Sequence, residues 1–275
     1  MTTLPFQTYQ EATEYFGIKI PRHFYNSLAT VDNFCQKSKL DTLDELFNAF
    51  GLLRIEGNDA RYQQTPIEMF PFASTGSDGT HYGFIIHTTD EEDYPSGEIC
   101  PMDSDGVVLI SNNSETLLQK LIWEDENNVN LLPILNELNL NISTVERRRY
   151  DSFGNSLRVT VNPKIGWQFL STIDGAGVFA QEKFFDKLHI TEYDYHNQQN
   201  GIERFERLAD EMYKKGLFAS QLFYLKELYW NEWTNYELAK KYLTQMLIPY
   251  EKLNREHLYD TTRWTLDNFN SRYIA

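Results

Sequence analysis

Apolar positions recur at helical spacing near the start of the chain. A capping box at Thr8–Glu11 precedes apolar residues on one helical face, and Gly17 follows as a stop. Ile20-Pro21 predicts the start of a second helix, because the first turn of a helix does not need the N–H that proline lacks. A second capping box at Thr42–Glu45 opens another predicted helix, which Gly51 ends. This part of the chain is therefore predicted to be helical.

The period changes from helical to extended after Gly51. Apolar runs separated by turn residues predict five strands, at Leu52–Ile55, Ile67–Ala73, Tyr82–Thr88, Glu98–Met102 and Val107–Ser111. The last strand leads to Ser114, the expected N-cap of a helix that carries Leu117, Leu118, Leu121 and Ile122. Helices followed by strands and a further helix are typical of an α+β domain.

The rest of the chain divides into a mixed region and a helical region. The polar stretch Trp123–Asn130 is a predicted linker, so we expect an α+β domain at 1–125, a connecting α/β region at 126–199 and helical hairpins at 200–275. The mixed region contains a predicted helix at Leu131–Leu140 and predicted strands at Leu157–Val161, Trp167–Thr172 and Val178–Phe179, with a hairpin turn at Asp174-Gly175. The sequence leaves open whether these strands join the first sheet.

From Gly201 onward apolar stripes follow a helical period. Gly216 separates the first two stripes, a capping box at Thr234–Glu237 opens the third, and Pro249 is expected to interrupt it. The connections are short, which predicts antiparallel helical hairpins. Trp230, Trp233, Tyr236 and Tyr242 are either core residues of these hairpins or anchors for a bound peptide.

Charge separates the first part of the chain from the rest. The net charge is −15, and residues 1–125 hold 7 Lys and Arg against 20 Asp and Glu, whereas residues 126–275 hold 18 against 20. An acidic surface disfavours nucleic acid and anionic membranes and attracts basic proteins, although it also serves solubility alone. The basic run Arg147-Arg148-Arg149 is too short to predict nucleic-acid binding on so acidic a chain.

Other features of the composition predict a cytoplasmic protein without a cofactor. Hydrophobic residues make up 41% and aromatic residues 15% of the chain, enough for a sizeable core. Cys35 and Cys100 form no metal-binding or redox spacing, so we expect buried free thiols in a reducing compartment. No signal peptide and no apolar run long enough to cross a bilayer is visible.

The stretch Glu68–His87 is the most locally constrained part of the sequence, with two apolar runs around a glycine-rich turn. Gly76, Gly79 and Gly83 do not form a phosphate-binding loop, because no lysine follows and the next residues predict a strand. We expect these glycines to supply positive φ angles or close backbone approach in a hairpin.

Asp78, His81 and His87 are the candidates for chemistry in this hairpin. A metal site needs three or more converging ligands at a recognised spacing, which is absent here. Ser74 and Ser77 lack the Gly-x-Ser-x-Gly context of a hydrolase nucleophile. A polar turn with a satisfied histidine is favoured, and a hydrolytic enzyme that uses Asp78 and His81 is the alternative.

An acidic run follows the hairpin. Its members are Asp90, Glu91, Glu92 and Asp93, and Asp103 and Asp105 follow downstream. Their order does not match a calcium-binding EF-hand loop. The run is therefore either a solvated loop or a docking patch that accelerates association with a basic protein.

The chain from Ile20 to Ile122 resembles the SMI1/KNR4 (SUKH) superfamily. The resemblance rests on Ile20-Pro21, on the hairpin Phe72–Phe84 with Gly76, Asp78, Gly79, His81 and Gly83, on Ile99–Asp103, and on Val108–Asn113 before a helix. It implies a mixed α+β domain that binds proteins and lacks catalytic residues. It also implies an immunity protein that neutralises a toxin, often a basic nuclease, which agrees in sign with the acidic first part.

Overall fold

The computed structural model describes residues 4–38, 53–54, 61–75, 79–101, 106–114, 116–117, 161, 164–187 and 201–269. The chain forms two compact units. The first contains Met1–Ala60, Phe70–Met102 and Val108–Leu157, and the second contains Arg61–Met69, Asp103–Val107 and Arg158–Ala275. Helices and antiparallel strands make up these units, so the fold class is α+β, as predicted.

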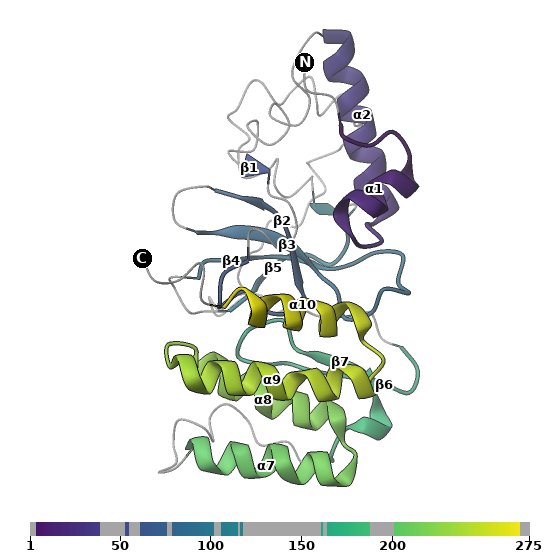
Figure 1. The fold of residues 1–275 in the computed structure, drawn as a ribbon. Coiled ribbons are helices and arrows are strands. Elements are labelled where there is room, and N and C mark those ends of the chain that lie inside the picture. The colour runs from purple at the N-terminus through teal and green to yellow at the C-terminus, as the bar shows by residue number, and fades with distance from the viewer. Residues whose placement is uncertain are drawn as a thin grey trace, which may run out of the picture. The chain divides into compact units, whose positions relative to one another are not determined.

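The helices of the first unit begin where local sequence predicts. Helix α1 (Tyr9–Phe16) has the complete capping box: Glu11 N–H donates to Thr8 Oγ1 at 3.2 Å, and Thr8 N–H donates to Glu11 Oε2 at 3.1 Å. The backbone N–H groups of Gln7 and Thr8 lower the pKa of the Glu11 carboxyl. Gly17 ends the helix at φ 70°. Helix α2 (Arg22–Ser38) follows and packs beside α1 (Figure 1).

Five strands form one sheet in the order β1-β2-β3-β4-β5. They are β1 (Leu53–Arg54), β2 (Met69–Ser74), β3 (His81–Ile85), β4 (Ser96–Ile99) and β5 (Val108–Ser111). Phe24 of α2 packs on Phe72 and Phe84, with ring centroids 5.4 and 5.0 Å away, so the core lies between this helix and the sheet.

Three strand predictions in this sheet differ from the structure at their ends. The prediction Glu98–Met102 is displaced along the chain, because β4 spans Ser96–Ile99 and Pro101 lies in a turn. The predicted strand Tyr82–Thr88 extends too far, because β3 ends at Ile85: its N–H donates to the Pro95 carbonyl, but Pro95 has no N–H with which to continue the pairing. The prediction for β2 begins too early, because Ile67 and Glu68 lie in a turn and belong to the second unit. The predicted elements at 42–51, 118–140 and 157–160 lie outside the described residues.

The second unit contains a separate two-stranded sheet. Strands β6 (Trp167–Leu170) and β7 (Val178–Gln181) pair antiparallel, with Phe169 opposite Phe179, and Asp174-Gly175 lies in the predicted turn between them. These two strands pair with each other and do not extend the five-stranded sheet. The short helix η3 (Glu182–Phe184) follows directly.

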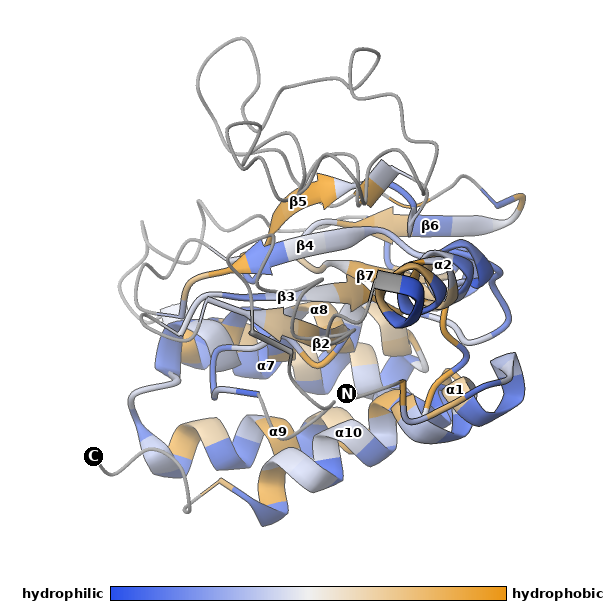
Figure 2. Ribbon diagram, turned by 90° about the horizontal axis from the view of Figure 1, so that it is seen from above, coloured by the Kyte–Doolittle hydropathy of each residue, from blue (hydrophilic) through white to orange (hydrophobic). Residues whose placement is uncertain are grey.

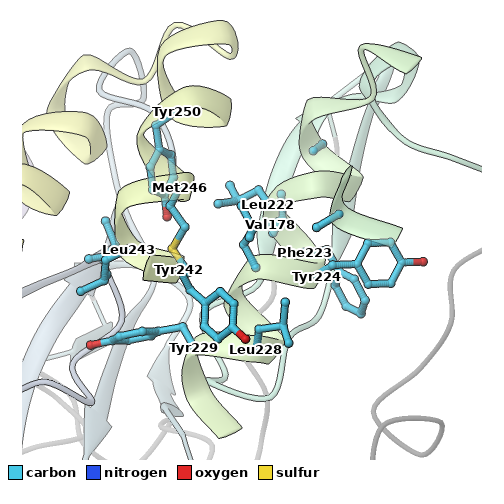
Figure 3. Close-up of a cluster of buried hydrophobic side chains, with 14 of the residues drawn as sticks. Val178, Leu222, Phe223, Tyr224, Leu228, Tyr229, Tyr242, Leu243, Met246 and Tyr250 are labelled. Carbon is cyan, nitrogen blue, oxygen red and sulfur yellow. The ribbon is translucent and has the colours of Figure 1, made fainter. Parts of the chain in front are cut away.

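Four helices complete the second unit and pack in sequence order (Figure 1). They are α7 (Gly201–Lys215), α8 (Phe218–Glu232), α9 (Tyr236–Lys252) and α10 (Glu256–Asp267). Helix α8 contacts α7, α9 and β7, and every residue from Ala219 to Trp230 is buried. Tyr242 and Met246 of α9 face α8 in the core (Figure 3). Hydrophobic and hydrophilic segments alternate along α9 and α10 (Figure 2), as expected for amphipathic helices.

Two details of α9 differ from prediction. The N-cap is Asn235 rather than Thr234, and its Oδ1 accepts the Leu238 N–H at 3.3 Å. Pro249 lies inside the helix, which continues to Lys252. Proline lacks the N–H that would donate to the carbonyl four residues earlier, so one helical hydrogen bond is lost, but the residues after Pro249 complete the last turn.

The connection from α9 to α10 depends on a left-handed residue. Asn254 has φ 55°, and the following N–H of Arg255 donates to the Tyr250 carbonyl at 2.8 Å. Asparagine tolerates this conformation better than alanine does. We expect Asn254→Ala to lower the free energy of unfolding by about 1 kcal/mol, measured by urea denaturation. Asn254→Gly is the control and should not destabilise; an equal loss in both variants would contradict this explanation.

Candidate functional site

The acidic run forms an exposed loop with buried ends. This acidic loop, Asp90–Asp93, connects β3 to β4 in the first unit. Asp90 and Glu92 are exposed and Glu91 and Asp93 are half-buried, whereas the residues on both sides, 86–88 and 94–97, are buried. The loop therefore places carboxylates in solvent from a short segment whose two ends are fixed in the unit.

Asp93 accepts hydrogen bonds from two backbone N–H groups, one of them in a distant part of the sequence. Its Oδ1 accepts the N–H of Tyr94 at 2.8 Å and the N–H of Ser114 at 3.0 Å, and Oδ2 lies 3.2 Å from the same Ser114 nitrogen. Ser114 is the first helical residue after β5, and Asn113 is its N-cap, because Asn113 Oδ1 accepts the Thr116 N–H at 2.9 Å. The prediction of Ser114 as N-cap is therefore wrong by one residue.

Tyr94 anchors the end of the loop. Its side chain is only 1% exposed and belongs to the hydrophobic core of the first unit. Burial raises the pKa of the Tyr94 hydroxyl, and the negative charges of Glu91, Asp90 and Asp93 raise it further. The Tyr94 hydroxyl therefore stays protonated beside the carboxylates of the acidic loop.

The structure describes three of the five hairpin residues that carry the resemblance to the SMI1/KNR4 superfamily. Gly79 has φ 78°, which a turn glycine provides without strain. Gly83 lies inside β3 opposite Gly97, so it is a strand residue and not a turn residue. Gly76 and Asp78 lie outside the described residues, as do Asp103 and Asp105 downstream.

His81 is part of the sheet. Its side chain is fully buried in β3, and its Nδ1 donates to the Gly79 carbonyl at 2.8 Å. His87 is also buried, but it follows the end of β3, so the two histidines do not share one strand. In the residues that the structure describes, no three His, Cys, Asp or Glu side chains are grouped to hold a metal ion.

A second cluster of charge is buried in the second unit around Lys226 of α8. The Lys226 ammonium, 3% exposed, donates to Glu68 Oε2, to Asp174 Oδ2 at 3.1 Å and to the Gly177 carbonyl at 3.0 Å. Tyr250 of α9 donates to Glu68 Oε1 at 2.8 Å. Burial lowers the pKa of Lys226, but the Asp174 and Glu68 carboxylates outweigh it and the net shift is upward.

This buried cluster is built for structure rather than for reaction. All three ammonium donors of Lys226 have acceptors, and Asp174 Oδ1 also accepts Thr172 Oγ1 at 2.5 Å and the Ala176 N–H at 3.0 Å. Burial and the Glu68 carboxylate raise the pKa of the Tyr250 hydroxyl well above its usual value. A protonated lysine with every donor occupied is not a nucleophile or a base.

The segment Arg61–Met69 is held in the second unit by the same cluster. Most of it is buried without regular secondary structure, so its carbonyl groups need donors. The Arg61 guanidinium donates to the carbonyls of Thr65, Pro66 and Met69, and Tyr229 Oη donates to the Gln63 carbonyl at 2.5 Å. The Arg61 bonds fold the segment on itself, and the bonds of Tyr229 to Gln63 and of Lys226 to Glu68 hold it to α8.

Sequence analysis missed Lys226, although one feature of α8 pointed to it. Lys226 and Glu227 are the only charged residues between Phe218 and Trp230, and apolar side chains occur on every face of that stretch. A helix that is apolar all round is buried, so its charged residues need partners. Glu227 has one in the Ile173 N–H, at 2.8 Å from its Oε1. The sequence does not identify these partners.

The aromatic residues considered as peptide anchors divide between core and surface. Trp230 and Tyr242 are buried, Trp233 is half-buried and Tyr236 is exposed. Every helix among the described residues is too short or too polar to cross a bilayer. Comparison of the chain with protein-family models and with curated proteins found no match in either.

Proposed function

We propose that this chain is a non-catalytic protein-binding module of the SMI1/KNR4 type that acts in the cytoplasm as an immunity protein. Its acidic loop binds a basic partner, such as a nuclease-type toxin domain. The observation that carries the proposal is the presentation of Asp90, Glu91 and Glu92 on a loop whose ends are buried. The negative charge of residues 1–125 supports it, because charges of one sign attract a basic partner at long range.

Charge reversal in the acidic loop tests this proposal. We expect the variant Asp90→Lys, Glu91→Lys and Glu92→Lys to associate about tenfold to a thousandfold more slowly with its partner, because steering by opposite charges is replaced by repulsion. Association rates are measured by surface plasmon resonance against a panel of purified basic nuclease-toxin domains, at about 0.05 M and about 0.5 M salt. The wild-type rate should fall as salt rises, and the variant rate should not.

A matched variant separates the loop from total charge. Asp210→Lys, Asp260→Lys and Asp267→Lys change the net charge equally, at exposed positions on α7 and α10. We expect this control to retain most of the association rate and to protect cells that express the toxin domain. An equal loss in both variants would show that net charge, not the loop, drives binding. If no domain in the panel binds and none is neutralised in cells, the proposed function is wrong.

A further inference from the structure

We infer that Asp93 is a positioning residue, which holds the acidic loop in one conformation by tying it to the helical turn at Ser114. The inference rests on the proposed function, which assigns the acidic loop its role in binding a partner. It goes beyond it by dividing the acidic run into two kinds of residue: Asp90, Glu91 and Glu92 present charge to a partner, and Asp93 fixes how they are presented.

The geometry places the Asp93 carboxylate between two parts of the chain 21 residues apart. It accepts the N–H of its neighbour Tyr94 and the N–H of Ser114, which is an N–H at the start of a helix and has no partner within that helix. Asn113 caps a different donor, the N–H of Thr116. The N–H groups of Ser114 and Thr116 therefore each have a side-chain acceptor. Removal of Asp93 leaves the Ser114 donor without its carboxylate.

The charge of Asp93 is used inside the protein. A carboxylate at the N-terminus of a helix interacts favourably with the helix dipole, and its bonds to N–H groups are stronger than those of a neutral acceptor. Asp93 is half-buried, as is Glu91, whereas Asp90 and Glu92 are exposed. The tether also reduces the ordering cost of binding, because a loop that is already fixed loses less conformational entropy when a partner docks.

Hydrogen exchange of the free protein gives the first test. We expect Asp93→Ala, which removes the acceptor, to accelerate amide exchange at residues 89–94 and at Ser114 by about fivefold or more, since a cap of this kind is worth about 1 kcal/mol. Glu92→Ala is the matched control, because it removes the carboxylate of an exposed neighbour, and its exchange should stay at the wild-type rate.

A second variant removes the donor instead of the acceptor. Ser114→Pro deletes the N–H that Asp93 accepts and leaves every loop residue unchanged, and proline is well tolerated at the first position of a helix. We expect it to accelerate exchange in the acidic loop as Asp93→Ala does. Because both variants break the same bond, the double variant should show no further acceleration.

A tetralysine titration separates a positioning residue from a contact residue. Chemical shifts of the loop amides report binding at the loop alone, so adsorption elsewhere on the acidic surface does not interfere. We expect Glu92→Gln to weaken tetralysine binding at these amides measurably and Asp93→Asn to leave it within about twofold, because the Asp93 charge is held by the helix. Equal weakening by both would make Asp93 a contact residue and overturn the inference.

Two further results would overturn the inference without touching the proposed function. One is wild-type exchange in both Asp93→Ala and Ser114→Pro, which would show that the tether does not hold the loop. The other is full additivity of the two variants, which would show that they act through different contacts. Conversely, failure of every toxin domain to bind leaves these measurements intact, since they use only the protein and tetralysine.

Discussion

Lys226→Ala is expected to lower the free energy of unfolding by about 3–5 kcal/mol, because it leaves two buried carboxylates without their cation. Glu68 and Asp174 are both almost fully buried, and the Lys226 ammonium bonds to each. Native domains have only about 5–15 kcal/mol of stability in total. Urea denaturation should therefore show a midpoint far below that of the wild type, with the slope unchanged.

An exposed ion pair in the same unit is the matched control. Lys241 of α9 bonds to Glu206 at 2.6 Å, but these side chains are 44% and 31% exposed. Lys241→Ala should cost less than about 1 kcal/mol, because solvent already screens the pair. The triple variant Lys226→Met, Glu68→Gln and Asp174→Asn should recover much of the loss, since it removes all three charges together. Equal effects of Lys226→Ala and Lys241→Ala would refute the explanation.

Gly175→Ala is expected to cost about 2–5 kcal/mol, from a left-handed backbone and a collision together. Gly175 has φ 79°, and a Cβ atom there would lie 2.5 Å from the Val107 nitrogen and closer still to the Val107 carbonyl oxygen. These are backbone atoms, and the Val107 N–H is bonded to the Asp174 carbonyl at 2.8 Å, so they cannot move aside easily. Thermal unfolding followed by circular dichroism measures the loss.

Gly166 isolates the contribution of the collision. It has φ 73°, close to that of Gly175, but a Cβ atom there would meet nothing within 4 Å. Gly166→Ala should therefore cost only the backbone strain, about 1–2 kcal/mol. The difference between the two variants measures the close approach of Val107 to the turn. If Gly166→Ala is as damaging as Gly175→Ala, the close approach contributes nothing.

Local sequence patterns predicted the parts of the fold that depend on neighbouring residues. The capping box at Thr8, the glycine stops at Gly17 and Gly216, and the Asp174-Gly175 hairpin all occur as expected. Each depends on groups within a few positions of one another, so the sequence contains the whole interaction. The α+β class follows from the order of these elements.

The same patterns located two N-caps one residue away from their true positions. Asn113 caps the helix assigned to Ser114, and Asn235 caps the helix assigned to Thr234. Serine, threonine and asparagine are all good N-caps, so two adjacent candidates differ little in preference. Which one caps depends on where the preceding backbone enters the helix, and composition does not encode that.

The contacts that define the two charged centres could not be predicted, because they join distant positions. Asp93 meets Ser114 across 21 residues, and Lys226 meets Glu68 across 158. The sequence showed the acidic run but not that one of its members is used internally. It likewise showed Glu68 at the start of an expected strand, whereas the structure places it in the second unit.

The segment Arg61–Met69 belongs to the same unit as residues that are synthesised much later, so the second unit cannot be completed early in translation. Glu68 is translated 158 residues before Lys226 and 182 before Tyr250. At a translation rate of about 5–20 residues per second, the Lys226 ammonium that balances this carboxylate is synthesised about 8–30 s after it. Until then the apolar side chain of Ile67, a member of the second core, is exposed as well. The nascent segment therefore has an unbalanced carboxylate and an uncovered apolar side chain until α8 and α9 have been synthesised.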